Sequence, residues 1–371
     1  MSRFGAALPL ARGSPATREQ HEISVKEHFS FYGITLEVSS PCAGLVDQVR
    51  RDFLYFHTPP QEHVDMRLQL LPESPRYDGL PVVPASVITP RNVCFRDGHT
   101  SYIDYFGRAL SVFNRGAGEC TVWSTDEDLL HEIAYLFFLS TAGEHLDHHR
   151  MHRIHALGLS YREQGILLLL PSGGGKSTTA INLLRRPDFM LLGEDTPLID
   201  KHGWMHPFPL RLGIRADAST DIPPRFLRTM KRMEFEPKTL IDLDYFEGRI
   251  GTAVPSRMLI VGTRYLGDVS EITPLARRKA FGTLVSNMVV GLGVYQGLEF
   301  LLERSVVEIA GKVGVVSSRL YNAIRLLKTA SVFRFRMGRD VERNTETLAT
   351  FIRLATRIEV EAKTPAAVLK N

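Results

Sequence analysis

The sequence predicts a mixed α/β protein, and three patterns in its 371 residues indicate this class. Short runs of alternating apolar and polar residues fill the segment 21–125, which is typical of strands. An apolar run at 165–170 leads into a glycine-rich turn and then into a helical pattern. Beyond Leu275, apolar residues recur at helical spacing. The chain therefore combines sheets with packed helices.

The segment 21–145 is predicted to form an N-terminal α+β module with a mostly antiparallel sheet. Its alternating runs lie between Gly, Pro, Asn and Asp turns, at 34–38, 66–70, 102–106, 110–113 and 120–123. One helix is predicted over Ala43–His57. A second is predicted over Asp126–Ala142, where Ser124, Thr125 and Asp126 offer helix caps. We find no catalytic motif in this module.

The segment 146–358 is predicted to form a second module that contains the glycine turn. Its predicted strands are 154–161, 165–170, 189–193, 258–261 and 332–336, and the stretch 197–262 is strand-rich. Its predicted helices begin near Thr178 and follow at 279–290, 294–309, 316–327 and 340–356. We interpret residues 1–20 as a flexible leader and 359–371 as a flexible tail.

Composition narrows the class of protein. The net charge of +4 does not by itself favour a nucleic-acid partner. Three cysteines without a CxxC pair indicate reduced thiols, which are typical of the cytoplasm. No apolar run approaches the ~18 residues that a membrane span needs. We therefore expect a soluble, cytoplasmic protein.

The glycine turn is the most informative feature of the chain. Its residues are Leu170-Pro171-Ser172-Gly173-Gly174-Gly175-Lys176-Ser177-Thr178. Glycines let backbone N–H groups crowd around phosphate oxygens, and the N-terminus of the following helix adds partial positive charge. A lysine here reaches the β- and γ-phosphates, and the next hydroxyl binds Mg²⁺. The turn therefore predicts a phosphate-binding loop, with Leu170 in place of the usual first glycine.

Two acidic residues, Glu194 and Asp195, follow the predicted strand at 189–193. A phosphate-binding loop works with an acidic group near the end of a neighbouring strand, which holds Mg²⁺ or orients the nucleophile. Because the pair stands at a strand end after the loop, we favour this role over a helix cap or a solvated carboxylate. The sequence thus predicts a nucleotide and Mg²⁺ site.

These motifs resemble the HPr kinase/phosphorylase family, which in turn resembles the ATP-dependent phosphoenolpyruvate carboxykinases. The loop matches the family's serine-glycine-x-glycine-lysine-serine run. His155, 21 residues before Lys176, stands where the family has a His-Gly start to the same strand. The pair Glu194-Asp195 is displaced by one residue from the family's Asp-Asp. The resemblance covers residues 152–200 closely and 201–358 in outline, and it implies an HPr-kinase-like ATP-binding domain.

The resemblance implies a role for each matched residue. The phosphates of ATP would be bound by Ser172, Gly173, Gly174, Gly175, Lys176, Ser177 and Thr178. Ser177 and Asp195 would bind Mg²⁺. Glu194 would take the proton from the attacking hydroxyl, and His155 would tune the acidic pair. Glutamate is one methylene longer than aspartate, which leaves two alternatives open. Either Asp195 is the base instead of Glu194, or the site acts as an ATPase.

Two departures from the family place the chain in a divergent branch. Leu170-Pro171 replaces the opening glycine and its follower, and the Glu-x-Arg-Gly-rich stretch linked to dephosphorylation is absent. HPr and the reverse reaction are therefore not expected. The chain is more similar to the HPr-kinase-related proteins of peptide natural-product and polysaccharide clusters. We expect an ATP- and Mg²⁺-dependent kinase acting on a serine-type hydroxyl of a small protein or peptide. The alternatives are a small-molecule kinase with the same site, or a nucleotide-binding regulatory or peptide-recognition module with little turnover.

Three arginines are candidates for gripping a phosphate or an acidic acceptor: Arg211, Arg215 and Arg264. They flank predicted core strands beyond the acidic pair, and guanidinium groups match phosphate geometry. The apolar stretch 281–302 most simply packs in the core, with a peptide-binding groove as the alternative.

Five histidines precede the loop, namely His145, His148, His149, His152 and His155. A closed zinc site needs about four convergent ligands, so we prefer a solvated, weakly basic helix end to a metal site here. The expected partner is a protein or peptide acceptor, without nucleic acid or a membrane span. The sequence leaves open a homo-oligomer and the role of residues 21–145.

Overall fold

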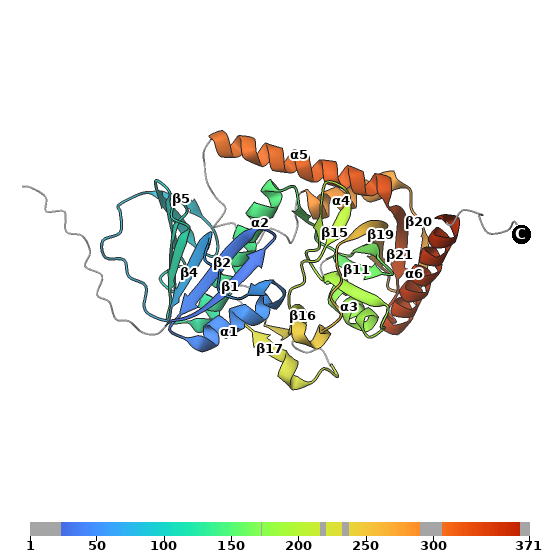
Figure 1. Cartoon of the computed structure of the whole chain (residues 1–371), viewed down its shortest axis with the longest axis horizontal. Helices are drawn as coiled ribbons and strands as arrows, with labels where there is room; N and C mark the ends of the chain where they lie inside the picture. Colours follow the sequence, from blue (N-terminus) through green and yellow to red (C-terminus); the bar gives the residue numbers. More distant parts are fainter. Residues whose placement is uncertain (1–23, 172, 216–219, 232–236, 290–305, 364–371) are drawn as a thin grey trace, which may run out of the picture.

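The computed structural model describes residues 24–171, 173–215, 220–231, 237–289 and 306–363. The predicted leader 1–20, Ser172 and most of the predicted helix 294–309 lie outside these ranges. Within them the chain is a mixed α/β protein with strands and helices in both halves (Figure 1). None of the helices in these ranges combines the length and apolarity that crossing a membrane requires.

The first half is built on a nine-stranded mixed sheet. Its strands in spatial order are β3 (His57–Thr58), β1 (Val25–Phe31), β2 (Ile34–Ser40), β4 (Met66–Leu71), β9 (Glu119–Trp123), β8 (Leu110–Asn114), β7 (Thr100–Asp104), β6 (Val93–Asp97) and β5 (Ala85–Ile88). β4 is parallel to both of its neighbours. The other neighbouring pairs are antiparallel, so the sheet is mostly antiparallel, as the alternating runs predict.

Two helices pack against this sheet. α1 (Ala43–Asp52) ends before the predicted boundary at His57, because the chain turns into a 3₁₀ segment at Leu54–Phe56. α2 (Glu127–His148) begins after Asp126, whose carboxylate accepts a hydrogen bond from the N–H of Leu129 at 3.1 Å. α2 is buried over most of its surface, and its core cluster includes residues of the second half of the chain. It therefore joins the two halves.

The glycine turn belongs to the second large sheet. Its strands in spatial order are β10 (His152–Arg153), β14 (Leu198–Ile199), β15 (Trp204–His206), β19 (Val254–Arg264), β12 (Gln164–Leu169), β11 (Leu157–Tyr161) and β13 (Phe189–Gly193), with β21 (Ser331–Met337) beside β19 and β20 (Ser270–Pro274) beside β21. β12, β19 and β21 are parallel, and both β12 and β13 are antiparallel to β11. The C-terminal ends of β12, β13, β19 and β21 therefore lie at one edge, which we call the carboxyl edge.

Helices cover both faces of this sheet. α3 (Lys176–Leu184) and α6 (Val341–Lys363) share a core cluster with alternate residues of β12, such as Ile166 and Leu168. α4 (Arg277–Met288) and α5 (Val306–Thr329) pack on the other face, with Leu167 and Leu169. Because both faces of the sheet are covered, the side chains on both sides of β12 are buried. This explains why β12 is a continuous apolar run.

A third, antiparallel sheet lies between the two halves (Figure 1), in the order β16 (Leu212–Arg215), β18 (Lys238–Ile241) and β17 (Leu227–Met230). Several element ends differ from those predicted. α3 begins at Lys176 instead of near Thr178, and α5 is longer than the predicted helix 316–327. α6 continues to Lys363, so the beginning of the predicted flexible tail is helical.

Candidate nucleotide and phosphate site

The predicted site residues meet at the carboxyl edge because of the strand directions. β12 ends at Leu169 and leads into the glycine turn, while β13 ends at Gly193, directly before Glu194. β11 runs in the opposite direction and begins two residues after His155. Three segments that are separate in sequence therefore place the lysine, the histidine and the acidic pair side by side.

The backbone of the turn needs its glycines. Gly175 has a φ of +92°, in the left-handed region that residues with a Cβ adopt only at a cost. A Cβ on Gly174 would lie 2.7 Å from the carbonyl oxygen of Pro171, which accepts the N–H of Gly174 at 2.9 Å. Space is open around Gly173, where an added Cβ would meet no atom within 4 Å. The turn is thus tightly closed on one side and accessible on the other.

The helix that follows the turn presents an open N-terminus. Gly175 is the N-cap of α3 and no side chain caps it. The first backbone bond of the helix runs from the N–H of Thr179 to the carbonyl of Gly175, at 2.9 Å. The preceding N–H groups of the first turn are left for another acceptor, and they lie at the positive end of the helix dipole. An anion such as a phosphate fits this arrangement.

Lys176 is buried and its amine lies in a small charged cluster. Its Nζ is 2.9 Å from Nε2 of His155 and 3.6 Å from Oδ1 of Asp195. Because an ammonium group can only donate, Nε2 of His155 must accept, which places the imidazole proton on Nδ1. Burial and the charge of Lys176 lower the pKa of His155, while Asp195 opposes this shift, so the neutral ring is favoured.

His155 has one nitrogen without a hydrogen-bond partner in the described ranges. Its Nδ1 is buried, and Oδ1 of Asp195 is its nearest charged neighbour, at 3.7 Å. That separation is too long for a hydrogen bond. A small movement of Asp195, whose side chain is 49% exposed, would satisfy Nδ1. The cluster is therefore capable of rearranging when a ligand enters.

Ser177 connects the loop to Glu194. Its Oγ lies 2.6 Å from Oε1 of Glu194 and 2.9 Å from the carbonyl oxygen of Gly213 on β16. A hydroxyl has one proton, so both contacts are satisfied together only when Glu194 is itself protonated and donates to Ser177. Burial and the neighbouring Asp195 raise the pKa of Glu194 to about 8, which favours that protonated form. Sequence patterns gave no signal for Gly213, because its carbonyl is the contacting group.

The three candidate arginines lie in different surroundings. Arg264 contacts the loop: its Nε donates to the carbonyl of Gly174 at 3.3 Å, and its Nη1 donates to that of Gly338 at 3.1 Å. It therefore ties the loop to the end of β21. Arg215 ends β16 with an exposed side chain, two residues beyond Gly213.

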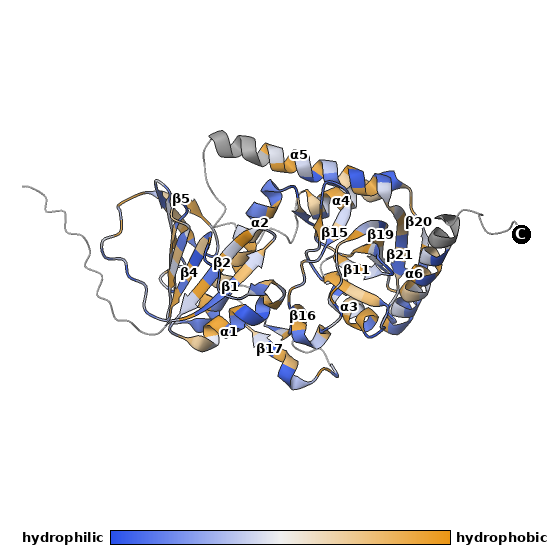
Figure 2. Cartoon of the chain, in the orientation of Figure 1, coloured by the Kyte–Doolittle hydropathy of each residue, from blue (hydrophilic) through white to orange (hydrophobic). Residues whose placement is uncertain are grey.

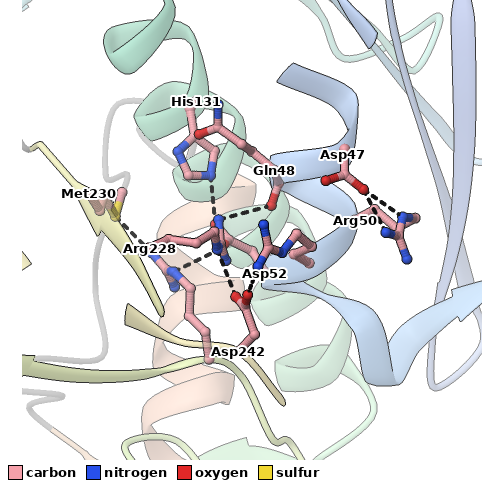
Figure 3. A network of polar contacts seen from close by, with 10 residues as sticks. Asp47, Gln48, Arg50, Asp52, His131, Arg228, Met230 and Asp242 are labelled. Atoms are coloured by element: carbon pink, nitrogen blue, oxygen red, sulfur yellow. Dashed lines mark hydrogen bonds and ion pairs between the residues drawn. The ribbon is translucent and has the colours of Figure 1, made fainter. Parts of the chain in front are cut away.

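Arg211 instead belongs to a buried ion network around Asp52, between the two halves. Figure 3 shows Asp52 of this network together with His131, Arg228 and Asp242. Its Nε lies 2.9 Å from Oδ1 of Asp52, at the end of α1, and its guanidinium covers the ring of Tyr135 at 3.8 Å. Asp52 is also bound by Arg228 and by Nε2 of His131, the latter at 2.8 Å. Although burial opposes it, these positive partners hold the pKa of Asp52 well below its usual range. Arg211 thus contacts the first half of the chain, an arrangement that its position in the sequence did not indicate.

The five histidines do not gather in one place. His148 and His149 bond to backbone carbonyls within α2, and His145 bonds to the carbonyl of Tyr32. His152 is fully buried between Asp147 and Ser318. In the described ranges, no group of three or more His, Cys, Asp or Glu side chains is arranged to hold a metal ion. A Mg²⁺ ion that is bound mainly by phosphates, one hydroxyl and one carboxylate does not need such a group.

Comparison with protein-family models gives no match for this chain, and none of the curated proteins matches it. The geometry of the carboxyl edge therefore carries the functional conclusion.

Proposed function

We propose that this protein is an ATP- and Mg²⁺-dependent kinase that transfers the γ-phosphate to a serine-type hydroxyl of a small protein or peptide. One observation carries the proposal. At a single sheet edge, a glycine turn and an uncapped helix N-terminus lie next to a lysine, a hydroxyl and two carboxylates. Phosphoryl transfer requires mainly positioning, neutralisation of charge and one base, and this edge offers residues for each.

In this proposal the loop binds the phosphates of ATP. The N–H groups at the start of α3 bind phosphate oxygens, and the buried Lys176 supplies a positive charge beneath them. Arg264 keeps the loop in place through its bond to Gly174. Mg²⁺, when bound, would neutralise phosphate charge and orient the transferred group.

The contacts of the two carboxylates favour a division of roles between them. Glu194 touches Ser177, so these two residues together would offer oxygen ligands for Mg²⁺, with binding of the metal releasing the proton of Glu194. Asp195 is more exposed and lies beside His155 and Lys176, so it is better placed to meet an incoming hydroxyl. We therefore assign the base role to Asp195 and the metal role to Ser177 with Glu194, which reverses the roles that the family resemblance implies for the pair.

The test is a transfer assay with the purified full chain, γ-labelled ATP and Mg²⁺, with and without peptides from neighbouring genes. Label on a peptide supports the kinase. Label only in free phosphate would favour an ATPase, and nucleotide binding without any turnover would refute both activities.

Two substitutions test the assigned residues. Lys176→Ala should abolish transfer, because it removes the positive charge beneath the loop. Asp195→Asn should lower transfer by ~10²-fold or more while nucleotide binding persists, because a positioned base contributes about that factor. Asp188→Asn is a matched control, since the Asp188 side chain is 48% exposed and lies before β13 instead of after it. Full transfer by Asp195→Asn would show that the base is another residue.

A further inference from the structure

α4 and α5 lie together on one outer side of the second half (Figure 1), and their sequences contain both apolar and basic residues. Figure 2 shows hydrophobic and hydrophilic residues mixed along α5. Phe281 on α4 and Ile324 on α5 are each 39% exposed, and Tyr321 on α5 is 58% exposed. Large apolar side chains that are grouped and exposed on a protein surface commonly mark a binding site.

A hollow of about 250 Å³ lies between the two helices. It is lined by Arg277, Arg278, Phe281, Ile324, Leu327 and Lys328. We call this set the α4–α5 face. Its centre is apolar and its rim carries three cations.

The positive charge of the α4–α5 face is not compensated within the described part of the chain. Arg277, Arg278 and Lys328 form no ion pair with any described residue. The sequences of α4 and of α5 beyond Glu308 contain no Asp or Glu at all. The complement of this face is therefore a segment with apolar residues on one side and carboxylates around them.

α4 connects the α4–α5 face to the candidate site. The backbone N–H of His155 donates to the carbonyl of Asn287, near the C-terminal end of α4, at 3.0 Å. Six residues separate Phe281 from Asn287, which is ~9 Å along a helix with a rise of ~1.5 Å per residue. A partner held on the α4–α5 face would therefore lie close to the residues that we assign to phosphate transfer.

We propose that the α4–α5 face binds an acidic amphipathic segment of the phosphate acceptor. Apolar side chains of the segment enter between Phe281 and Ile324, and its carboxylates face Arg277, Arg278 and Lys328. A second copy of this chain is disfavoured, because two such faces would oppose cation to cation. A basic, apolar helix can also lie on an anionic membrane, but here the apolar residues line a hollow between two helices instead of a single convex ridge.

Only the identity of the partner as the acceptor rests on the proposed function; the binding does not need turnover. The experiment measures fluorescence anisotropy of a labelled 18-residue helical peptide, with Leu at i, i+3, i+4 and i+7 and Glu at most other positions. A scrambled peptide and a peptide with Lys in place of Glu are the controls. Lys176→Ala should bind the peptide as tightly as the wild type does, which separates docking from catalysis.

Reversing the charge of the rim gives the decisive comparison. The double variant Arg277→Glu/Arg278→Glu should bind the acidic peptide ~10-fold more weakly, since it replaces two attractive charges on the rim by two repulsive ones. Arg67→Glu/Arg225→Glu changes two exposed cations, on β4 and on the 3₁₀ segment Pro224–Phe226, and should bind within twofold of the wild type. Lys328→Glu reverses the rim cation on α5 instead of those on α4. This second variant repeats the test, so that poor folding of one variant does not decide the result.

Three outcomes would overturn the proposal. One is equal binding by the wild type and both rim variants. Another is equal binding of the acidic and scrambled peptides. The third is binding to 3:1 phosphatidylcholine–phosphatidylserine vesicles without binding to the acidic peptide, which would identify the face as a membrane surface instead.

Discussion

Replacing Glu194 by Gln tests whether this carboxyl is protonated in the folded protein. Burial and the charge of Asp195 raise its pKa from an ordinary value of 4.5 to about 8. Between these two values the folded protein holds a proton that the unfolded chain releases, so folding becomes less favourable as the pH rises. Gln is neutral at every pH and keeps the shape, so the variant should lose this dependence.

The size of the effect follows from the two pKa values. One pH unit within this window changes the free energy of unfolding by up to ~1.4 kcal/mol. Between pH 5.5 and 7.5, Glu194 should therefore lower the stability of the wild type by about 2.5 kcal/mol relative to the Gln variant. Below pH 4.5 both states are protonated and the contribution disappears; above pH 8 both are ionised and the penalty stays constant.

Urea unfolding of both proteins at pH 5.5, 6.5 and 7.5, followed by circular dichroism, measures this difference. Titrating groups away from Glu194 are shared by the two proteins, so their contributions cancel when the two curves are subtracted. Glu62→Gln, at an exposed position, should show no pH-dependent difference from the wild type. If Glu194→Gln and the wild type change in parallel with pH, Glu194 is ionised throughout. The proton that we place between Glu194 and Ser177 would then be absent.

Two further substitutions test the ion network and the loop. Asp52→Ala should lower the free energy of unfolding by ~3–5 kcal/mol, because it removes the carboxylate that pairs with the buried Arg211 and leaves Arg228 with Asp242 alone. Asp47→Ala, on the same helix and in an exposed pair, should change it by less than ~1 kcal/mol, so similar losses in the two variants would contradict the argument. Gly175→Ala should cost ~1–2 kcal/mol because of its positive φ, and it should weaken ATP binding in calorimetry. Gly44→Ala in α1 should be neutral or stabilising, so equal effects of the two glycine variants would refute the backbone explanation.

Much of the fold could be predicted because local patterns and burial agree. The strand at 189–193 has the same bounds in sequence and structure, and the helix at Asp126 is capped as its sequence suggests. The predicted ends of several helices differ from those in the structure. The end of α1 at Asp52 was not predicted, because the apolar residues Phe53 and Phe56 continue the helical spacing into the 3₁₀ segment Leu54–Phe56.

The residues of the candidate site could be predicted where they belong to one continuous stretch of the sequence. The loop, His155 and the acidic pair were found by their order and spacing, and strand directions bring them together. The contacts that distinguish Glu194 from Asp195 could not be predicted, because they depend on which carboxylate reaches Ser177 and on the carbonyl of Gly213. Arg211 shows the same limit, since its partner is 159 positions away in the chain, at Asp52.

The ion network also gives the first half of the chain a structural connection to the candidate site. Arg211 binds Asp52 and directly precedes β16, and Gly213 on β16 accepts the hydrogen bond of Ser177. In addition, Leu198, Phe208 and Leu210 of the second half are buried in the core cluster of the first half. Removing residues 24–145 would expose this apolar surface and remove the carboxylate that pairs with Arg211, directly before the strand whose Gly213 carbonyl accepts from Ser177. The first half therefore supports the geometry of the carboxyl edge, whatever partner it also binds.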